Sequence, residues 1–317
     1  LAAEKEDDTV LLGGMPVGIY METDGVLVLD TEKMTGMDGK EYTPAQGVVS
    51  SGDYITEVNH QKIEGKKQLM DLVEHLDGEK VLLTVRRENT ILEKKLTPVQ
   101  ISKGNYRLGI WVRDNVQGLG TITFLTKNNR FAALGHGIHD VDTSTLLTIK
   151  RGTLYRTSIQ KVQKGSKGNP GTMEGIIVYN RFHQLGAIEK NTDAGIYGEL
   201  NSDRSWIGEE VPIQVAKKEE IKTGEARIRC YIDGEVKEYT ICITQIDKES
   251  DQVNKGMVIQ VTDTELLEKT GGIIQGMSGS PIIQNGKLIG AVTHVFVQDS
   301  TKGYGIFIEN MLKEEES

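Results

Sequence analysis

The sequence predicts a mostly β protein made of two units, a small α/β domain followed by a larger strand-rich domain. Short apolar segments separated by turns recur along the 317 residues, and 36 glycines with only 6 prolines fit many tight turns. One stretch in the first hundred residues has clear helical periodicity, and a polar segment near residue 100 separates it from the strands that follow. At roughly 150 residues per domain, the length also agrees with two domains.

The composition excludes several classes of function. A net charge of −9 argues against nucleic-acid binding, where a basic face is expected. No run of about 18 apolar residues is present, so no membrane span is expected. No group of Cys and His has metal-ligand spacing, so we expect neither a metal nor another cofactor. The chain begins Leu-Ala-Ala-Glu with no Met or signal peptide, so we expect residues 1–10 to be a disordered remnant behind a removed export or anchor segment.

The first domain is expected over residues 11–98. Apolar segments that alternate with turns lie at 16–21, 25–29, 51–59 and 80–86. Between the last two, Gly65 to Leu76 is predicted as a helix that ends at the following Asp-Gly pair. Its apolar residues recur at helical spacing, at Leu69, Leu72, Val73 and Leu76.

This order of elements resembles a PDZ domain, most specifically in the run Gly52-Asp53-Tyr54-Ile55 followed by Val58-Asn59. In that family a peptide or C-terminal tail binds as an added strand beside the long helix. The family's carboxylate loop resembles Gly-Leu-Gly-Phe, and the corresponding segment here is Pro-Val-Gly-Ile. The resemblance implies a peptide-binding groove formed by these residues: Val17, Gly18, Ile19, Tyr20, Leu69, Leu72 and Val73.

The second domain is expected over residues 107–317, after a polar linker. It contains short strands between glycine turns, for example at 108–112, 175–179, 211–216 and 257–261. Helical signals are few, at 263–268 and at the C-terminal end. This pattern favours a β-barrel or sandwich over an α/β sheet.

The two cysteines are expected to be free thiols. Asp233-Gly234 lies between two alternating segments and predicts a two-residue hairpin. That register pairs Cys230 with Lys237 and places Cys242 on the opposite face from Cys230.

The segment Gly276-Met277-Ser278-Gly279-Ser280-Pro281 is the strongest candidate for a catalytic site. Glycines on both sides of a serine allow a tight turn that exposes the hydroxyl and directs two backbone N–H groups toward one point. A nucleophilic serine with an oxyanion hole requires this arrangement. A glycine-rich turn with a solvated serine is the alternative.

A predicted hairpin over residues 120–136 ends in Leu134-Gly135-His136. A serine hydroxyl is a poor nucleophile at neutral pH and needs a base, and histidine is the usual one. His136 precedes Ser278 on short strands, which is the chymotrypsin-like order, whereas an α/β-hydrolase has its serine first. His139 and His294 are competing histidines, and of these His294 follows the strand after Ser278.

These motifs look like those of the sporulation stage IV protein B peptidases, which join a PDZ domain to a serine peptidase domain. The resemblance rests on the segments 134–143 and 276–287 together with Thr293-His294-Val295. It implies a chymotrypsin-like double β-barrel in which His136 is the general base and Ser278 the nucleophile. The backbone N–H groups of Gly276 and Ser278 would form the oxyanion hole.

The third member of the catalytic triad has two candidates. The family resemblance indicates Asp263, shortly before the serine, and we favour it slightly. The chymotrypsin-like topology instead indicates Asp193, which lies between the histidine and the serine at the start of a strand. Asp140 and Asp142, close to His136 in the sequence, are interpreted as turn and cap residues.

The resemblance implies a serine endopeptidase of sporulation signalling. It would be exported into the space between the forespore and mother-cell membranes and anchored there by an N-terminal segment that this sequence lacks. There it would cleave a membrane-associated regulator, and itself, to trigger activation of a late sigma factor. The alternative is a non-enzymatic PDZ scaffold with a degraded peptidase domain.

Overall fold

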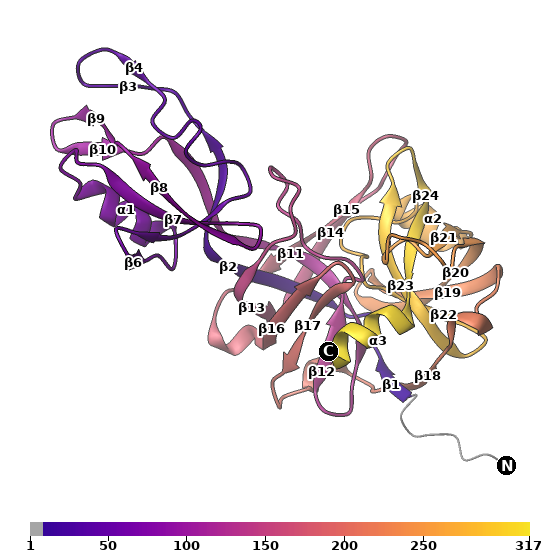
Figure 1. The fold of residues 1–317 in the computed structure, drawn as a ribbon. Helices are drawn as coiled ribbons and strands as arrows, with labels where there is room; N and C mark the ends of the chain where they lie inside the picture. Colours follow the sequence, from indigo (N-terminus) through magenta and orange to yellow (C-terminus); the bar gives the residue numbers. More distant parts are fainter. Residues whose placement is uncertain (1–8) are drawn as a thin grey trace. The chain divides into compact units, whose positions relative to one another are not determined.

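The computed structural model describes residues 9–317 and divides them into two compact units (Figure 1). The larger unit contains the described residues up to Tyr20, Gln117–Ile138 and Gly152–Ser317. The smaller unit contains Met21–Val116 and His139–Arg151. The chain therefore passes from one unit to the other four times.

The expected domain boundaries differ from this division. Residues 1–8 of the expected remnant lie outside the described residues, but Thr9 and Val10 begin strand β1 (Thr9–Leu12) and are not disordered. The larger unit also takes residues 11–20, and the smaller unit takes 107–116 and 139–151. The reason is that β2 (Pro16–Thr31) and β11 (Ile110–Leu125) are 16-residue strands, each long enough to belong to both units.

The smaller unit has the α/β composition that the sequence predicts. Its core contains Val26, Ile55, Leu69, Leu83 and Val85, which come from strands and from one helix. The predicted helix is present as α1, and β5 lies antiparallel to β7 next to it in the sheet. Besides parts of β2 and β11, the elements are β3 (Met34–Thr35), β4 (Glu41–Tyr42), β5 (Tyr54–Val58), β6 (Gln61–Lys62), α1 (Lys66–Glu74), β7 (Val81–Arg87), β8 (Thr90–Leu96), β9 (Val99–Ser102) and β10 (Asn105–Arg107).

The larger unit is built almost entirely of antiparallel strands. Its elements are β12 (Arg130–Ala133), β13 (Ile149–Tyr155), β14 (Thr157–Gln163), β15 (Thr172–Ile177), β16 (Gln184–Thr192), β17 (Gly195–Leu200), β18 (Pro212–Val215), β19 (Gly224–Ile232), β20 (Glu235–Ile246), β21 (Met257–Val261), α2 (Thr264–Thr270), β22 (Pro281–Gln284), β23 (Lys287–Phe296), β24 (Asp299–Phe307) and α3 (Ile308–Glu316). Strands β14 and β15 form a two-stranded sheet of their own.

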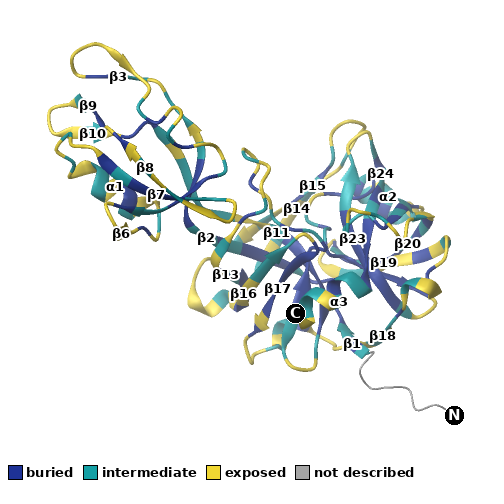
Figure 2. Ribbon diagram, in the orientation of Figure 1, coloured by how far each residue is buried: buried dark blue, intermediate teal, exposed yellow. Residues whose placement is uncertain are grey.

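Two rings of strands give the larger unit a chymotrypsin-like double β-barrel. One ring runs β19–β20–β21–β24–β23–β22 and returns to β19. The other runs β2–β11–β12–β17–β16–β13, with β13 again beside β2. Closing a sheet into a ring leaves no unpaired edge along it. Along ring strands such as β19 and β20, buried residues alternate with partly or fully exposed ones (Figure 2).

The two barrels share an apolar contact. Phe124, Ala132 and Tyr197 of the first barrel belong to the same buried cluster as Leu288 and Ala291 of the second. The second barrel also has a core of its own, rich in isoleucine from β19 to β22. The apolar contact therefore fixes the barrels against each other, and loops from both can form one site.

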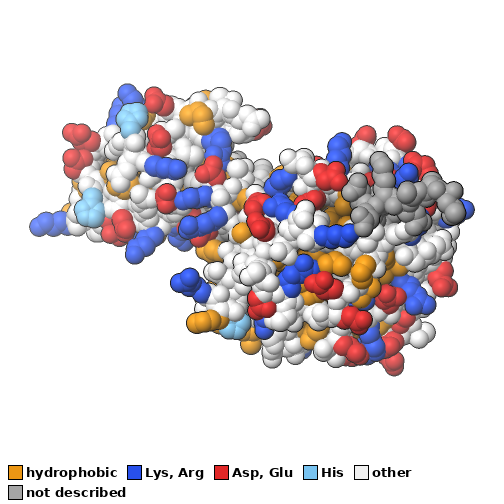
Figure 3. Space-filling model, turned by 90° about the horizontal axis from the view of Figure 1, so that it is seen from below, with side chains coloured by type: hydrophobic (Ala, Val, Ile, Leu, Met, Phe, Trp, Pro, Cys, Tyr) orange, Lys and Arg blue, Asp and Glu red, His pale blue; other side chains and the backbone are white. Residues whose placement is uncertain are grey.

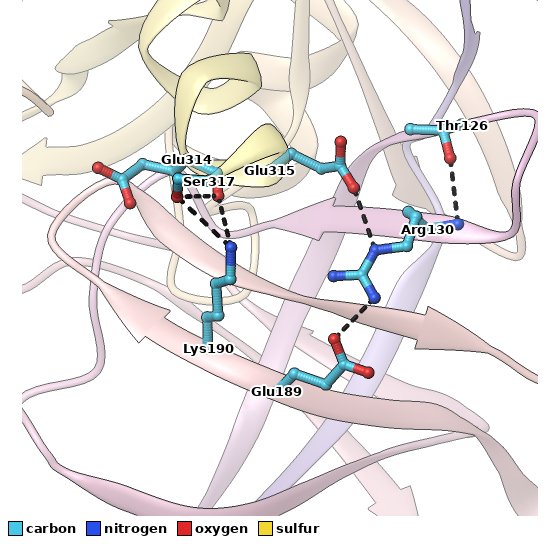
Figure 4. Close-up of polar contacts among 7 residues, drawn as sticks. All are labelled: Thr126, Arg130, Glu189, Lys190, Glu314, Glu315 and Ser317. Carbon is cyan, nitrogen blue, oxygen red and sulfur yellow. Dashed lines mark hydrogen bonds and ion pairs between the residues drawn. The ribbon is translucent and has the colours of Figure 1, made fainter.

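Helix α3 is fastened to the first barrel by polar contacts (Figure 4). The Arg130 guanidinium, at the start of β12, donates through Nε to Glu315 at 3.1 Å and through a terminal nitrogen to Glu189 at 2.7 Å. Lys190 Nζ donates to the Glu314 carbonyl at 3.1 Å. These contacts anchor the strand whose far end leads to His136.

The predicted Asp-Gly hairpin joins β19 and β20 in the expected register, with Ile232 opposite Glu235 and Cys230 opposite Lys237. Both cysteines are free thiols. Cys230 is buried, and this burial raises the pKa of its thiol to about 12, so the thiol stays protonated and unreactive. Cys242 is only partly buried.

Acidic and basic side chains are interspersed over the face drawn in Figure 3. Of the helices within residues 9–317, none has the length and apolar character needed to cross a membrane. Within the same residues, no group of three or more His, Cys, Asp or Glu side chains is placed to hold a metal ion.

Candidate active site

The loop that contains Ser278 belongs to the second barrel and contacts the first. It follows α2 and the Gly271-Gly272 pair and leads into β22. Two threonine hydroxyls of β11 hold it from the first barrel: Thr121 Oγ1 donates to the Gly276 carbonyl at 2.9 Å and Thr123 Oγ1 to the Gly279 carbonyl at 2.7 Å. From the second barrel, the Val292 carbonyl accepts from the Gly279 N–H at 2.7 Å. Hydrogen bonds from both barrels therefore hold the loop.

The glycines in this loop are required by its geometry. Gly276 and Gly279 have φ values of 104° and 93°, a region that side chains with a Cβ rarely adopt. A Cβ on Gly279 would also lie 2.5 Å from the backbone nitrogen of Leu134. The glycines on either side of Ser278 thus allow a tight turn and a close contact between the loop and the first barrel.

Two backbone N–H groups of the loop have no acceptor in the described part of the chain. Among the hydrogen bonds of residues 9–317, none uses the N–H of Gly276 or Ser278 as its donor, whereas Met277, Gly279 and Ser280 all donate to carbonyls. Unpaired N–H groups next to a serine hydroxyl can bind a developing negative charge on a substrate oxygen. This is the pair that the sequence analysis assigned to an oxyanion hole.

The Ser278 hydroxyl lies beside strand β23. Its Oγ donates to the Thr293 carbonyl at 2.9 Å. Ser280, the other serine of the loop, is fully buried, and its Oγ donates to the Met277 carbonyl at 2.6 Å. Only Ser278 therefore has a partly accessible hydroxyl, which agrees with its choice as the candidate nucleophile.

His136 lies at the end of the β12 segment and packs against His294 of β23. The two ring centroids are 4.8 Å apart at an interplanar angle of 34°. His294 directly follows Thr293, which accepts the Ser278 hydroxyl, so the structure brings His136, His294 and Ser278 to one region. His294 was expected only as a competing histidine.

The protonation state of the His136 ring follows from its hydrogen bond. Nδ1 lies 2.8 Å from the Gly137 carbonyl oxygen. A carbonyl can only accept, so Nδ1 must carry the proton, and in the neutral ring Nε2 is then the basic nitrogen. A base acting through Nε2 is what a neighbouring serine requires.

Asp263 has a structural role at the N-terminus of α2. One carboxylate oxygen accepts from the Leu266 N–H and the other from the Thr240 N–H, each at 3.1 Å. The first contact is a helix N-cap, and the second ties the helix to β20. The expectation that Asp263 orients His136 gains no support from these contacts.

Asp193 lies in the turn between β16 and β17, beside the segment that contains His136. Ile196 of β17 pairs with Ala133 of β12, and a Cβ on Gly195 would lie 3.3 Å from the Gly135 nitrogen. The Asp193 carbonyl accepts from the Asn254 side chain, and the Asn254 carbonyl accepts from the Thr293 hydroxyl at 2.7 Å. Hydrogen bonds through Asn254 thus connect the Asp193 backbone to Thr293, whose carbonyl accepts from the Ser278 hydroxyl.

Asp140 and Asp142 lie in a turn of the smaller unit. Asp140 Oδ1 accepts from the backbone N–H groups of Asp142 and Thr143, and both aspartates pair with Arg113. They are turn residues, as the sequence analysis interpreted them.

The sequence matches the SpoIVB peptidase S55 family over residues 104–312. The chain belongs to this family. It is therefore a serine peptidase, a hydrolase in which the PDZ-like unit is inserted within the sequence of the chymotrypsin-like unit.

Three further likenesses cover parts of the peptidase. A protein of Helicobacter pylori (strain J99) named as a zinc metalloprotease is 31% identical over 110 residues, and these are 31% of each chain. The PDZ domain of an SdrC-like protein from Listeria monocytogenes is 24% identical, with a TM-score of 0.22, over 28% of this chain and 87% of that one. A protease of M. tuberculosis in its active form is 16% identical, with a TM-score of 0.37, over 62% of this chain and 72% of that one.

The predicted peptide-binding strand of the PDZ-like domain is wrong. Val17, Gly18, Ile19 and Tyr20 belong to the larger unit, where Val17 and Ile19 are buried and a Cβ on Gly18 would meet Ile177. The physical reason is the length of β2, because its first residues pack in the larger unit and only its later residues reach the PDZ-like core.

The PDZ-like domain does have a pocket along α1, with a volume of about 350 Å³. Leu69 and Val73 are among the residues that line it, whereas Leu72 packs against the core and does not line the pocket. The opposite wall is the segment 105–112, which leads into β11. Met70 and Trp111 also line the pocket, with 51% and 59% of their surfaces exposed.

The sequence contained a signal for this wall that the sequence analysis missed. Arg107-Leu108-Gly109-Ile110 is closer to Gly-Leu-Gly-Phe than Pro-Val-Gly-Ile is, because it keeps the Leu-Gly pair. The Gly109 carbonyl accepts from the Glu32 N–H at 2.9 Å, so this segment continues the sheet from the end of β2. The sequence pattern instead predicts residues 108–112 as a strand of the second domain.

Proposed function

We propose that Ser278 is the nucleophile of this serine peptidase and His136 its general base. The observation that carries the proposal is the loop 276–280, which presents one partly accessible hydroxyl between two backbone N–H groups that have no acceptor in the described chain. In the reaction, the Ser278 hydroxyl leaves the Thr293 carbonyl, passes its proton to Nε2 of His136 and attacks the substrate carbonyl carbon.

The oxyanion formed by this attack would be bound by the N–H groups of Gly276 and Ser278. His136 then returns the proton to the leaving amine, and water hydrolyses the acyl-enzyme by the same route in reverse. We propose Asp193, rather than Asp263, as the carboxylate that stabilises the imidazolium, because both oxygens of Asp263 already accept backbone N–H groups.

A fluorophosphonate probe tests the nucleophile directly, because it phosphonylates activated serines. We expect wild-type protein to be labelled, with the label mapped to Ser278 by mass spectrometry. Ser280→Ala should still be labelled and Ser278→Ala should not. A wild-type protein that stays unlabelled, and that cleaves no peptide pool, would overturn the proposal and support the scaffold alternative.

Family membership supports a role in sporulation signalling. We propose that the peptidase is exported to the space between the forespore and mother-cell membranes. There it would cleave a membrane-associated regulator and itself, and so trigger activation of a late sigma factor. Incubating wild-type and Ser278→Ala protein with a candidate regulator tests the substrate, and equal cleavage by both proteins would contradict it.

We propose that the pocket along α1 binds the C-terminal residues of a peptide. Its walls are apolar at Leu69, Met70, Val73 and Ile110, and the segment 107–110 has the Leu-Gly order of a PDZ carboxylate loop. An apolar terminal side chain would fill the pocket while the peptide backbone lies along the 108–112 segment.

Arrayed peptides that end in each of the amino acids test this binding mode. We expect peptides with an apolar last residue and a free carboxylate to bind, and their amidated forms to bind more weakly. Val73→Asp should abolish binding, since it places a charge in the apolar wall. Ile91→Asp, which changes an exposed residue of β8 outside the pocket, is the control. Equal binding by both variants would contradict the proposal.

A further inference from the structure

The β14–β15 hairpin contacts the residue that precedes the proposed oxyanion hole. The Met173 N–H donates to the Gln275 carbonyl at 2.9 Å, and the Gln275 N–H donates to the Gly171 carbonyl at 2.8 Å. Thr172 and Gln275 thus form an isolated parallel bridge. Both backbone polar groups of Gln275 are therefore held by the hairpin.

The Gln275 carbonyl and the Gly276 N–H belong to the same peptide unit. That unit is planar and trans, so its carbonyl and its N–H point in opposite directions. The Met173 N–H, by binding the carbonyl, fixes the direction of the Gly276 N–H. A rotation of this peptide would break the Met173 contact and turn the N–H away from its present direction.

Side-chain packing supports the same arrangement. Met173 is buried, and a Cβ on Gly276 would lie 3.1 Å from the Met173 Cβ and Sδ. Gly171 is equally close to the loop, because a Cβ there would lie 2.7 Å from Cγ2 of Ile274. The hairpin and the residues before Ser278 are packed without space between them.

The hairpin is held from outside the barrels. Within the described residues, its strands form a separate two-stranded sheet, and the bridge of Thr172 to Gln275 is outside that sheet. Its loop is fastened by contacts at the end of α2 and beyond β23: Gly165 N–H to the Thr270 carbonyl, Gly168 N–H to the Val297 carbonyl and Lys164 Nζ to the Glu268 carbonyl. It can therefore move without opening either ring of strands.

We propose that the β14–β15 hairpin positions the oxyanion hole, with Met173 and Gly171 as positioning residues that act through Gln275. The inference rests on the proposed function, because it assigns a support to the Gly276 N–H of that site. Displacing the hairpin would free the Gln275–Gly276 peptide to rotate. The peptidase would then lose one donor to the oxyanion while Ser278 and His136 keep their places.

The variant pair Met173→Pro and Met173→Ala tests this directly. Both lose the buried side chain, but only proline lacks the N–H that binds Gln275. That N–H points out of the hairpin toward Gln275, so proline removes no hydrogen bond between β14 and β15. We expect fluorophosphonate labelling of Met173→Pro to be about 100-fold slower than that of Met173→Ala, as for the loss of one oxyanion donor.

A second pair displaces the hairpin by a steric change. Gly171→Ala places a methyl group against Gly165 and Ile274. Gly168→Ala, in the same loop, meets no atom within 4 Å and adds only the backbone strain of its φ of 79°. We expect slower labelling for Gly171→Ala than for Gly168→Ala. Thermal unfolding of all four variants identifies any that lose activity through misfolding.

Hydrogen–deuterium exchange separates this inference from the proposed function. We expect the amides of residues 272–280 to exchange faster in Met173→Pro than in Met173→Ala, whether or not the protein is labelled. Equal exchange and equal labelling in the two variants would overturn the role of the hairpin. A wild-type protein without Ser278-dependent labelling would overturn the proposed function, and exchange alone would then decide whether the hairpin fixes the Gln275–Gly276 peptide.

Discussion

Ser278→Ala should lower the rate constant for peptide-bond cleavage by about 10⁶-fold, the magnitude found when a catalytic serine or histidine is removed from a serine protease. The substitution removes only the hydroxyl that donates to the Thr293 carbonyl at 2.9 Å. The loop itself is held by Thr121, Thr123 and Val292 through backbone atoms of Gly276 and Gly279, so its shape should persist. Cleavage of a peptide pool by purified wild-type and variant protein measures the effect.

Ser280→Ala is the matched control for this loss. It removes a hydroxyl from the same loop, but one that is buried and donates to the Met277 carbonyl. We expect it to lower the free energy of unfolding by about 1 kcal/mol and to keep most of the activity. Should Ser278→Ala retain the wild-type cleavage rate, the nucleophile lies elsewhere and the proposed function is wrong.

Asp193→Asn should lower the cleavage rate by up to about 10⁴-fold, the cost of the equivalent change in a Ser-His-Asp triad. In the proposed mechanism, the Asp193 carboxylate stabilises the imidazolium that forms when His136 takes the serine proton. The Gly137 carbonyl lies 2.8 Å from Nδ1 of His136 and favours the tautomer with the proton on Nδ1. The loss of cleavage rate should therefore be smaller than for Ser278→Ala. The change should appear in kcat with KM little altered, since the imidazolium forms only during the reaction.

Asp263→Asn distinguishes the two candidate carboxylates. Its side-chain nitrogen cannot accept the N–H of Thr240 or Leu266, so one of these contacts is lost. We expect the free energy of unfolding to fall by about 1 kcal/mol while kcat stays close to the wild-type value. The opposite result, with Asp263→Asn inactive and Asp193→Asn active at equal stability, would restore Asp263 as the third member.

Local patterns in the sequence predicted much of this fold. The Asp233-Gly234 turn fixed the register of β19 and β20, because a two-residue hairpin leaves a single pairing. Helical spacing located α1, and the order of His136 and Ser278 indicated a double barrel. The glycines beside Ser278 predicted a tight turn, and Gly276 and Gly279 do have positive φ values, which glycine adopts readily.

The groove of the PDZ-like domain could not be predicted in the same way. Two similar segments, Val17-Gly18-Ile19 and Leu108-Gly109-Ile110, were available as its wall. The choice depends on which one lies beside α1, and that contact joins residues about forty positions apart in the sequence. It depends also on how the long strands β2 and β11 divide between the two units, which no short window of sequence reveals.

The sequence by itself determined the class of this protein and its two principal candidate residues. The serine loop and the preceding histidine are local motifs, and glycine spacing and chain order are enough to recognise them. Only the tertiary structure decided what surrounds them. Asp263 caps a helix, Asp193 lies beside the His136 segment, and the β14–β15 hairpin holds the Gln275–Gly276 peptide. The cap of Asp263 to Leu266 is local, but its second contact, to Thr240, joins distant parts of the chain. The contacts of Asp193 and of the hairpin also join distant parts of the chain, and therefore have no signature in the neighbouring residues.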